Sequence, residues 1–428
     1  MYRLLAATLA AASCATIAQA QTVSEPGIPT ASPATRDTLT LDQALAQGGA
    51  ASPSLESATA GIRAATAART VAGLRPNPEV QAQTENVGGT GVYKGLRSSE
   101  TTVGVALPLE LGGKRPARIA LANARLTRAQ IQSAIAIADL RQRITQLYVQ
   151  AAAAERRAEV LGQQATIAAE ASRIATDRVQ VGAASPIEQQ RADVLRINAQ
   201  VAAQSASRDA QAARTNLAGL IGRPVVGELD RAWFDQVGGY GPPAPIEVEG
   251  TLALAAAEAD VNTANAQIRV ARSLRTPDVT VSVAARRLEA TNDTAAVVGV
   301  AIPIPFFNNG RALVSQARAE QTQSVALRNL AVLDTRQAIA SAQAEVANAA
   351  ATARATGGPG LTAAAEAARI ARIGYGQGKF DQIQLLDAER TLSQTRQAYV
   401  DALAAYHDAE ARLERLTTPA PTPDRLER

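Results

Sequence analysis

The stretch from Lys114 to Val181 constrains the fold more than any other, because no proline follows Pro116 in it and Gly162 is its only glycine. An uninterrupted helix of this length would extend about 100 Å at a rise of about 1.5 Å per residue. From Leu140 onward, alternate steps of four and three residues reach apolar or small side chains, which is the 3.5-residue period of a coiled-coil seam. The seam consists of Leu140, Ile144, Leu147, Ala151, Ala154, Ala158, Leu161, Ala165, Ala168, Ser172, Ala175 and Val179. Because most of these residues are alanine, each contact buries little apolar area and the helix needs several close partners.

Residues 1–20 are predicted to be a signal peptide, with a positive charge at Arg3, an apolar core and the small-x-small cleavage site Ala18-Gln19-Ala20. Residues 21–38 contain three prolines and are predicted to be a flexible leader. The only cysteine, Cys14, lies in the signal segment, and the sequence leaves open whether it is lipidated or removed. No later segment has the roughly 20 continuous apolar residues of a transmembrane helix, so a spanning role would have to use strands.

Charge and composition argue against several classes of function. The formal net charge is only +4 and basic and acidic residues are interspersed, so nucleic-acid binding is not supported. An exported enzyme is disfavoured, because the mature chain has no cysteine, no histidine pair and no nucleophile elbow. The sole histidine, His407, is predicted to be a helix-surface or interface residue rather than a metal ligand. We therefore expect neither a metal site nor a cofactor.

A second organising feature is an internal repeat with a period of about 200 residues, which is too long for a solenoid and indicates a duplicated half. Four landmarks recur in the same order: Leu74–Val80 with Leu274–Val279, Val103–Leu109 with Val298–Ile304, Gly113-Lys114 with Gly310-Arg311, and Val181-Gly182 with Gln377-Gly378. The predicted parts are a first half at 39–221, a linker or equatorial belt at 222–249, a second half at 250–417 and a tail at 418–428. Trp233 and Phe234 are predicted to anchor the belt.

Helical patterns cover most of both halves. Helices are predicted over 41–46, 54–74, 114–181, 186–221, 250–274, 310–355, 361–373 and 381–416. The segment Gly357-Gly358-Pro359-Gly360 is predicted to interrupt the second long helix, and it has no equivalent in the first half.

Within each half, one segment changes to a period of two residues, which predicts β-hairpins at 78–109 and 277–305. One strand face is apolar and is predicted to face a membrane: Val103, Val105, Leu107, Val279, Val281, Val283, Val298, Val300 and Ile302. The other face carries small and polar residues such as Gln81, Gln83 and Ser282, which would line a wet pore. The alternative is two hairpins half-buried in a soluble sheet. We favour the membrane, because isolated hairpins in a mostly helical chain lack a partner core.

The number of strands has a further consequence. Four strands cannot close a barrel, since the smallest outer-membrane barrels have eight. Several chains must therefore contribute, and three chains would supply twelve strands.

Several short motifs match a known family. Arg75-Pro76-Asn77-Pro78 leads into the first strand, Leu107-Pro108-Leu109 and Ile302-Pro303-Ile304 end strands, and Tyr375-x-x-Gly378 precedes Leu385-Leu386-Asp387-Ala388. Together with the two-fold internal repeat, these motifs resemble the outer-membrane channel proteins of the TolC type, most closely the CzcC-like members paired with heavy-metal efflux pumps. The resemblance implies a mainly α fold with a small membrane β part. In that fold a long α-helical coiled-coil barrel continues into a trimeric 12-stranded β-barrel.

The resemblance also implies partners and a location. It implies a homotrimer in contact with outer-membrane lipid, with a large periplasmic part that docks to a periplasmic adaptor protein and an inner-membrane RND pump driven by proton flow. The chain would then be a passive efflux duct and not an enzyme, with heavy-metal cations as the favoured cargo. Two alternatives remain at this stage: a periplasmic coiled-coil adaptor or scaffold, and a TolC-type channel for organic compounds or protein secretion.

The helix turns at Gly182 and Gly378 are the strongest candidate site. The residues expected to be exposed there for adaptor contact are Arg178, Val181, Gly182, Ala183, Tyr375, Gly378 and Lys379. The resemblance implies acidic residues that ring the entrance. Asp387 falls on one such position, Gln384 occupies another where an acid is expected, and Asp381 is a weaker candidate. The alternatives are turn geometry alone for the glycines, an exposed ion pair with Arg390 for Asp387, and a helix cap for Asp381.

Overall fold

The computed structural model describes residues 38–48, 52–238 and 248–422. The predicted signal peptide with Cys14, the leader up to residue 37, residues 239–247 of the linker and residues 423–428 of the tail therefore lie outside the described residues. All described residues belong to one compact unit. Thr38, which the sequence assigned to the leader, instead begins a short strand.

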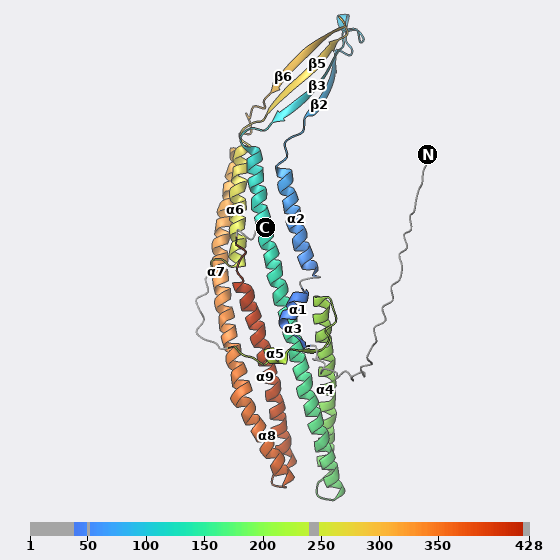
Figure 1. Cartoon of the computed structure of the whole chain (residues 1–428), viewed down its shortest axis with the longest axis vertical. Coiled ribbons are helices and arrows are strands. Elements are labelled where there is room, and N and C mark those ends of the chain that lie inside the picture. The colour runs from blue at the N-terminus through green and yellow to red at the C-terminus, as the bar shows by residue number, and fades with distance from the viewer. Residues whose placement is uncertain (1–37, 49–51, 239–247, 423–428) are drawn as a thin grey trace, which may run out of the picture. The chain divides into compact units, whose positions relative to one another are not determined.

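Long helices make up most of the described chain, and their bounds lie within a few residues of the predicted ones. They are α1 Leu41–Gly48, α2 Pro53–Ala72, α3 Lys114–Gln180, α4 Pro186–Ile221, α6 Leu252–Ser273, α7 Arg311–Ala355, α8 Leu361–Gly376 and α9 Gln382–Thr417. α3 packs against α2, α4, α6 and α9, and α9 also packs against α7 and α8. The turns α3–α4 and α8–α9 lie at one end of these helices, and a β-sheet lies at the other (Figure 1). Within the described ranges, no helix combines the length and apolar character that crossing a bilayer requires.

The coiled-coil seam predicted in α3 is confirmed. Every seam position from Leu140 to Val179 is buried or half-buried. Ala151 and Ala175 have no exposed surface. Because these side chains are small, α4 and α9 can both pack closely on α3. The stability of α3 therefore comes from several neighbouring helices and not from one broad apolar face.

The largest buried cluster surrounds Tyr148 of α3. There β1 (Thr38–Leu39) pairs in parallel with β4 (Glu228–Leu229). The Tyr148 hydroxyl donates a hydrogen bond to the carbonyl of Leu39 at 2.7 Å and accepts one from the N–H of Asp230 at 2.9 Å. Burial raises the pKa of Tyr148 to about 12, so the hydroxyl keeps its proton at neutral pH. One buried side chain thus joins the first strand, the linker and the longest helix.

Trp233 and Phe234 anchor the described part of the linker to the helices, as predicted. Phe234, the last residue of α5 (Arg231–Phe234), is 1% exposed, and the Trp233 indole stacks on the imidazole of His407 with ring centroids 4.2 Å apart. His407 does not lie on the helix surface: it is 3% exposed, and its Nε2 lies 2.9 Å from the carbonyl oxygen of Phe234. Stacking and this hydrogen bond offset the burial of the ring, so His407 is an internal contact between α9 and the linker.

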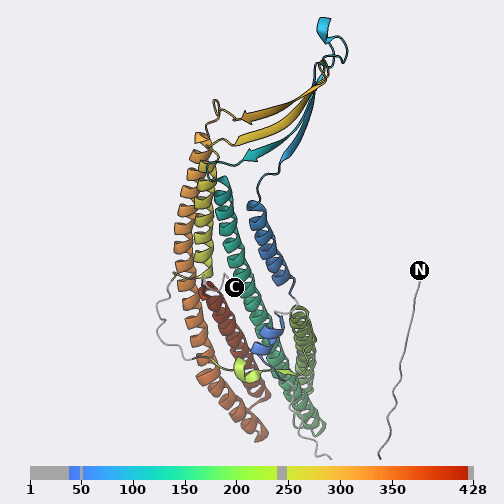
Figure 2. The ribbon, with the colours of Figure 1, turned by 45° about the horizontal axis from the view of Figure 1, so that its top comes forward.

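Both predicted hairpins form, and they pair with each other in one sheet of order β2-β3-β5-β6. The strands are β2 Glu79–Glu85, β3 Glu100–Leu109, β5 Val279–Leu288 and β6 Asp293–Ala301. All three neighbouring pairs are antiparallel. The β3–β5 pairing joins the two halves of the chain, and the strands lie side by side in Figure 2. In the described chain, β2 and β6 are the edges of this sheet.

A fixed junction joins the sheet to the start of α3. Gly112 has a φ of 70°, and a Cβ at this position would lie 2.5 Å from the Cβ of Thr276. The carboxylate of Asp278, just before β5, accepts a hydrogen bond from the N–H of Leu111 at 3.0 Å and lies 2.7 Å from Nζ of Lys114. The β3–α3 and α6–β5 connections are therefore bonded to each other, which fixes the sheet on the helices beneath it.

The predicted interruption at Gly357–Gly360 is a turn of π-helix, Thr356–Gly360, and not a break, so α7 continues through it into α8. Pro359 lacks an N–H, and in a regular α-helix its ring would clash with the carbonyl four residues earlier. A wider π-turn relieves this conflict. At the same turn α7 and α9 approach closely, since a Cβ at Gly357 would lie 2.2 Å from Cε2 of Tyr399. The irregular turn thus makes room for a tyrosine between two helices.

We expect Gly357→Ala to destabilise the purified protein by about 1–3 kcal/mol, because the added methyl group overlaps the Tyr399 ring. The matched control is Gly358→Ala in the same turn, where a Cβ would meet no atom within 4 Å. Chemical denaturation followed by circular dichroism measures both variants. Equal unfolding midpoints for the two variants would contradict the assignment of Gly357 to this contact.

Candidate functional site

The turns α3–α4 and α8–α9 have the same backbone geometry. Gly182 and Gly378 adopt φ angles of 72° and 70°. A Cβ at either glycine would meet no atom within 4 Å, so the left-handed conformation and not lack of space requires glycine. In both turns the N–H of the residue after the glycine bonds the carbonyl five residues earlier, from Ala183 to Arg178 and from Lys379 to Gly374, each at 2.8 Å. These are two Schellman motifs at corresponding places in the two halves.

Several predicted tip residues are exposed. Val181, Gly182, Ala183, Gly378 and Lys379 all present accessible surface at the turns. Val181 is 78% exposed. Two further apolar residues that the sequence did not single out, Ile187 and Ile383, are 62% and 61% exposed beside them.

Two other predicted tip residues are not freely exposed, which corrects the expectation for Tyr375 and Arg178. Tyr375 is 7% exposed and packs against Ala371 and Leu385, with Ile174 of α3 beside them. The guanidinium carbon of Arg178 lies 5.1 Å from the centre of the Tyr375 ring, and Arg178 is half-buried as a result. The contact is a cation–π interaction, so the aromatic ring is covered from the side of α3.

A second contact joins the two turns. Gln382, the first residue of α9, is 6% exposed, and its Nε2 donates to the carbonyl of Glu188 in α4 at 3.4 Å. Sequence reasoning missed Gln382, because a polar residue after a turn carries no periodic signal. Together with Arg178 and Tyr375, it holds the α3–α4 turn against the α8–α9 turn.

Asp381 caps α9, and Gln384 completes the cap. The Asp381 carboxylate accepts from the N–H of Gln384 at 2.8 Å, while Oε1 of Gln384 accepts from the N–H of Asp381 at 3.2 Å. This reciprocal pair is a capping box. An acid at position 384 could accept the same bond, so the box accounts for a side chain with an acceptor there but not for the choice of Gln.

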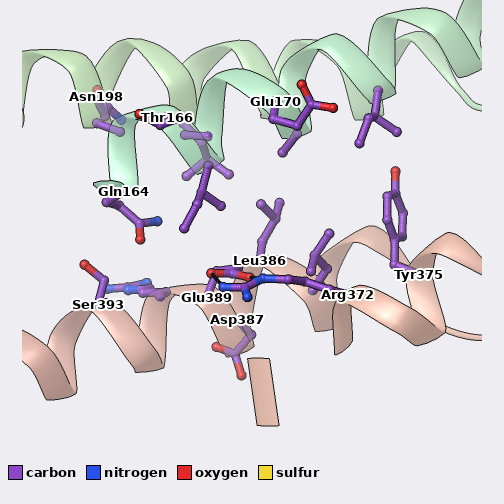
Figure 3. Close-up of a pocket in the computed structure, with 18 of the residues that line it drawn as sticks. Gln164, Thr166, Glu170, Asn198, Arg372, Tyr375, Leu386, Asp387, Glu389 and Ser393 are labelled. Atoms are coloured by element: carbon purple, nitrogen blue, oxygen red, sulfur yellow. Dashed lines mark hydrogen bonds and ion pairs between the residues drawn. The ribbon is translucent and has the colours of Figure 1, made fainter. Parts of the chain in front are cut away.

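Above the turns, a cavity of about 1210 Å³ lies between the α3–α4 pair and the α8–α9 pair (Figure 3). Its lining is mainly apolar, with Leu161, Ile167, Ile174, Leu195 and Leu386 among its residues. Figure 3 shows Gln164 and Glu170 on the α3 side and Arg372 and Glu389 on the α8–α9 side. The two helix pairs are therefore held together at the turns but separated by this cavity further along.

Glu389 and Arg372 form an ion pair at the wall of the cavity. Glu389 is 3% exposed, and both of its carboxylate oxygens accept from Arg372, with Nη2 at 2.9 Å from Oε2 and Nε bonded to Oε1. The hydrogen bond to Glu389 raises the pKa of Arg372. Sequence reasoning missed this pair. Glu389 lies four residues after Leu385 and three before Leu392, both of which are buried, and this heptad spacing predicts an apolar residue at position 389.

Asp387 lies on a different face of α9 from Glu389. Two residues along a helix correspond to a rotation of about 200°. In Figure 3 the Asp387 carboxylate extends away from α3 and α4. Asp387 is exposed, and among the described residues no ion pair joins it to Arg390 or to any other side chain. The alternative of an exposed ion pair with Arg390 is therefore not found, and the carboxylate is accessible to solvent.

Eight of the nine predicted membrane-facing residues lie in the strands and share one face of the sheet, because residues paired across antiparallel strands lie on the same side, and the ninth, Ile302, directly follows β6. The exposed members, at 43–73%, are Val103, Val105, Leu107, Val283, Val298, Val300 and Ile302. Val279 and Val281 are half-buried instead, near the junction with the helices. One row crosses the whole sheet through the pairs Val80 with Val105, Val105 with Val283, and Val283 with Val298.

Within the part of the chain that the structure describes, no group of three or more His, Cys, Asp or Glu side chains is arranged to hold a metal ion.

We expect Arg372→Met to destabilise the protein by about 3 kcal/mol, because it leaves the buried Glu389 carboxylate without a partner. The control is Arg369→Met, one turn earlier, where both partners of the Arg369–Glu366 pair are exposed and the unfolding midpoint should not change. Thermal or urea unfolding distinguishes the two. A destabilisation of the same size in both variants would mean that burial of Glu389 is not the cause.

Comparison with known proteins agrees with this architecture. The model of the family described as "Outer membrane efflux protein" matches residues 40–223 and 248–418. The cobalt-zinc-cadmium resistance protein CzcC of Cupriavidus metallidurans is 32% identical over 391 residues, which cover 88% of this chain and 90% of that protein. Among solved structures, CusC aligns with a TM-score of 0.75 at 17% identity over 90% of this chain and 93% of CusC. The outer membrane protein VceC of Vibrio cholerae aligns with a TM-score of 0.72 at 19% identity over 89% of this chain and 96% of VceC. The two structural alignments establish the fold, and on the family match and the identity with CzcC the chain belongs to the outer membrane efflux protein family.

Proposed function

We propose that three copies of this chain form one passive duct, in which twelve strands close a β-barrel across the outer membrane and the helices continue it as a tunnel through the periplasm. The observation that carries the proposal is a four-stranded sheet with an exposed apolar face and two open edges, β2 and β6. In a bilayer every backbone polar group needs a partner, so β6 of one copy would pair with β2 of the next until the ring closes. Four strands per chain are too few for a barrel, and three copies are enough.

The apolar face supports contact with lipid. The row from Val80 to Val298 is 78%, 49%, 60% and 73% exposed at its four positions, in strand order. In a soluble protein such a row would lie against a core, yet no helix covers it in Figure 1 or Figure 2. Exposed aromatic side chains flank the sheet, with Tyr93 in the β2–β3 connection and Phe306 and Phe307 after β6. Aromatic residues at both borders are typical of outer-membrane strands.

The helices also offer surface for a second copy. α4 exposes Val194, Ile197 and Val201 at 56%, 49% and 58%. Their spacing of three and four residues places them on one stripe of the helix. In the trimer this stripe would pack against helices of the adjacent copy. The division into halves at 39–221 and 250–417 around a belt at 222–249 remains part of the proposal, as do the signal peptide at 1–20 and the tail at 418–428.

The partners follow from the exposed turns. The exposed tips around Val181, Gly182, Gly378 and Lys379 would meet a periplasmic adaptor, which links the duct to an inner-membrane RND pump. Heavy-metal cations are the favoured cargo, because CzcC is named as a cobalt-zinc-cadmium resistance protein. The sheet disfavours a periplasmic scaffold, which has no use for an exposed apolar strand face. A channel for organic compounds or secreted proteins is the alternative that a transport assay would distinguish.

The sheet provides the test of the membrane duct. We expect Val283→Arg to abolish outer-membrane assembly, because an arginine at the lipid face of a barrel costs about 2–4 kcal/mol near the bilayer midplane. The control is Gln81→Arg on the opposite face, which should assemble, since charged side chains are tolerated towards a water-filled lumen. Membrane fractionation and heat-modifiable gel mobility of the trimer report the outcome. A wild-type protein that stays soluble after membranes are pelleted would refute the duct.

The entrance has its own test at Asp387. Three copies would place three exposed carboxylates around one axis, where they would bind multivalent cations. We expect Asp387→Asn to weaken block of the channel by multivalent cations about ten-fold in planar-bilayer conductance, whereas Asp387→Glu should retain the block. Unchanged block in the Asn variant would remove Asp387 from the gate.

A further inference from the structure

The charged residues of the four strands are distributed unequally between the two faces of the sheet. The strand pairings place four carboxylates on the polar face together with a single guanidinium: Glu79, Glu85, Glu100, Asp293 and Arg286. On the apolar face the strands carry one charged residue, Arg287. The polar face is therefore strongly acidic, and Arg286 is its one positive charge.

Arg286 is held on three strands at once. From β5, its Nε donates to Oγ1 of Thr102 at 3.0 Å, and its Nη1 donates to Oε2 of Glu100 at 2.9 Å, both on β3. Its Nη2 lies 3.3 Å from Oε2 of Glu85 on β2. Glu85 and Glu100 are directly paired across their strands, where two like charges repel. Arg286 thus lies beside two adjacent carboxylates and reduces their mutual repulsion. Its planar, permanently charged guanidinium group can bond both carboxylates at once.

The neighbouring Arg287 provides a contrast within the same strand. Its Nη2 donates to Oδ1 of Asn292 at 2.6 Å and its Nε approaches Glu289 at 3.4 Å, both in the β5–β6 connection. It therefore bonds only within its own hairpin, and its side chain is 59% exposed. The two arginines are adjacent in sequence but differ in face and in partners.

We propose that Arg286 sets the ion selectivity of the strand section of the lumen, by neutralising carboxylates that would otherwise attract and retain passing cations. The inference rests on the proposed function, because it requires the polar face to line a water-filled barrel. In the trimer three such guanidinium groups would share one level of the lumen with six carboxylates from Glu85 and Glu100. The lumen at this level would favour cations over anions. The preference would be weaker than in a lumen that had the same carboxylates without Arg286.

The test is the permeability ratio of potassium to chloride, measured from the reversal potential of single trimeric channels in planar bilayers under a potassium chloride gradient. Arg286→Gln should raise this ratio about two-fold, because a unit charge one Debye length away, about 8 Å, changes the energy of a passing ion by about a third of RT after screening, with opposite signs for potassium and chloride. Glu100→Gln, a nearly isosteric change, should lower the ratio. The double variant Arg286→Gln/Glu100→Gln should return it close to the wild-type value, which a purely structural role for Arg286 would not produce.

The matched control is Arg287→Gln, which removes the same charge from the other face and should leave the ratio unchanged. Conducting channels with the same ratio in wild type, Arg286→Gln and Glu100→Gln would overturn the inference while leaving the duct intact. Equal shifts for Arg286→Gln and Arg287→Gln would also overturn it, because the effect would then not depend on the polar face. Wild-type protein that inserts no channel at all would instead bring down the proposed function, and the inference with it.

Discussion

Close approach between helices is the constraint on which the rest of the structure depends. α3 contacts helices along its whole length, and it can do so because its seam is built mostly from alanine. Small side chains give each contact little buried area, so the helix is stable only when several neighbours surround it. The same requirement explains Gly357, where even one methyl group would overlap Tyr399.

The sheet differs from the helices in that its two faces have different compositions. Alternation places valines in rows on one side and Gln, Glu, Ser and Arg on the other. The junction at Lys114 and Asp278 joins this sheet to α3, so the position of the strands is tied to the position of the long helix. Two of the connections between helices and strands, β3–α3 and α6–β5, are therefore bonded to each other.

The end of the helices opposite the sheet has both exposed tips and internal contacts between the two turns. The glycine turns have one shared geometry and leave apolar tips exposed. Just behind them, Arg178 on Tyr375 and Gln382 on Glu188 hold the two turns together across the end of a large cavity. Asp387 and Glu389 both line that cavity, but the Asp387 carboxylate extends away from α3 and α4 and is exposed, whereas Glu389 is buried against Arg372. Asp387 and Glu389 are thus only two positions apart but differ in environment: Asp387 is accessible to solvent, whereas Glu389 is buried in an ion pair.

The sequence by itself determined the helices, the strand segments and the glycine turns, because periodicity, proline and glycine act over a few neighbouring residues. It also predicted the face of each strand and the seam of α3. Only the tertiary structure decided that β3 pairs with β5, that His407 and Tyr375 are buried, and that Glu389 has a partner while Asp387 has none. Each of these outcomes depends on contacts between segments that are far apart in the sequence. Whether a polar side chain is buried or paired is therefore decided by the packing of those segments. The spacing of Glu389 from Leu385 and Leu392 is a local signal of burial, but its pairing with Arg372 is decided only where α8 packs against α9.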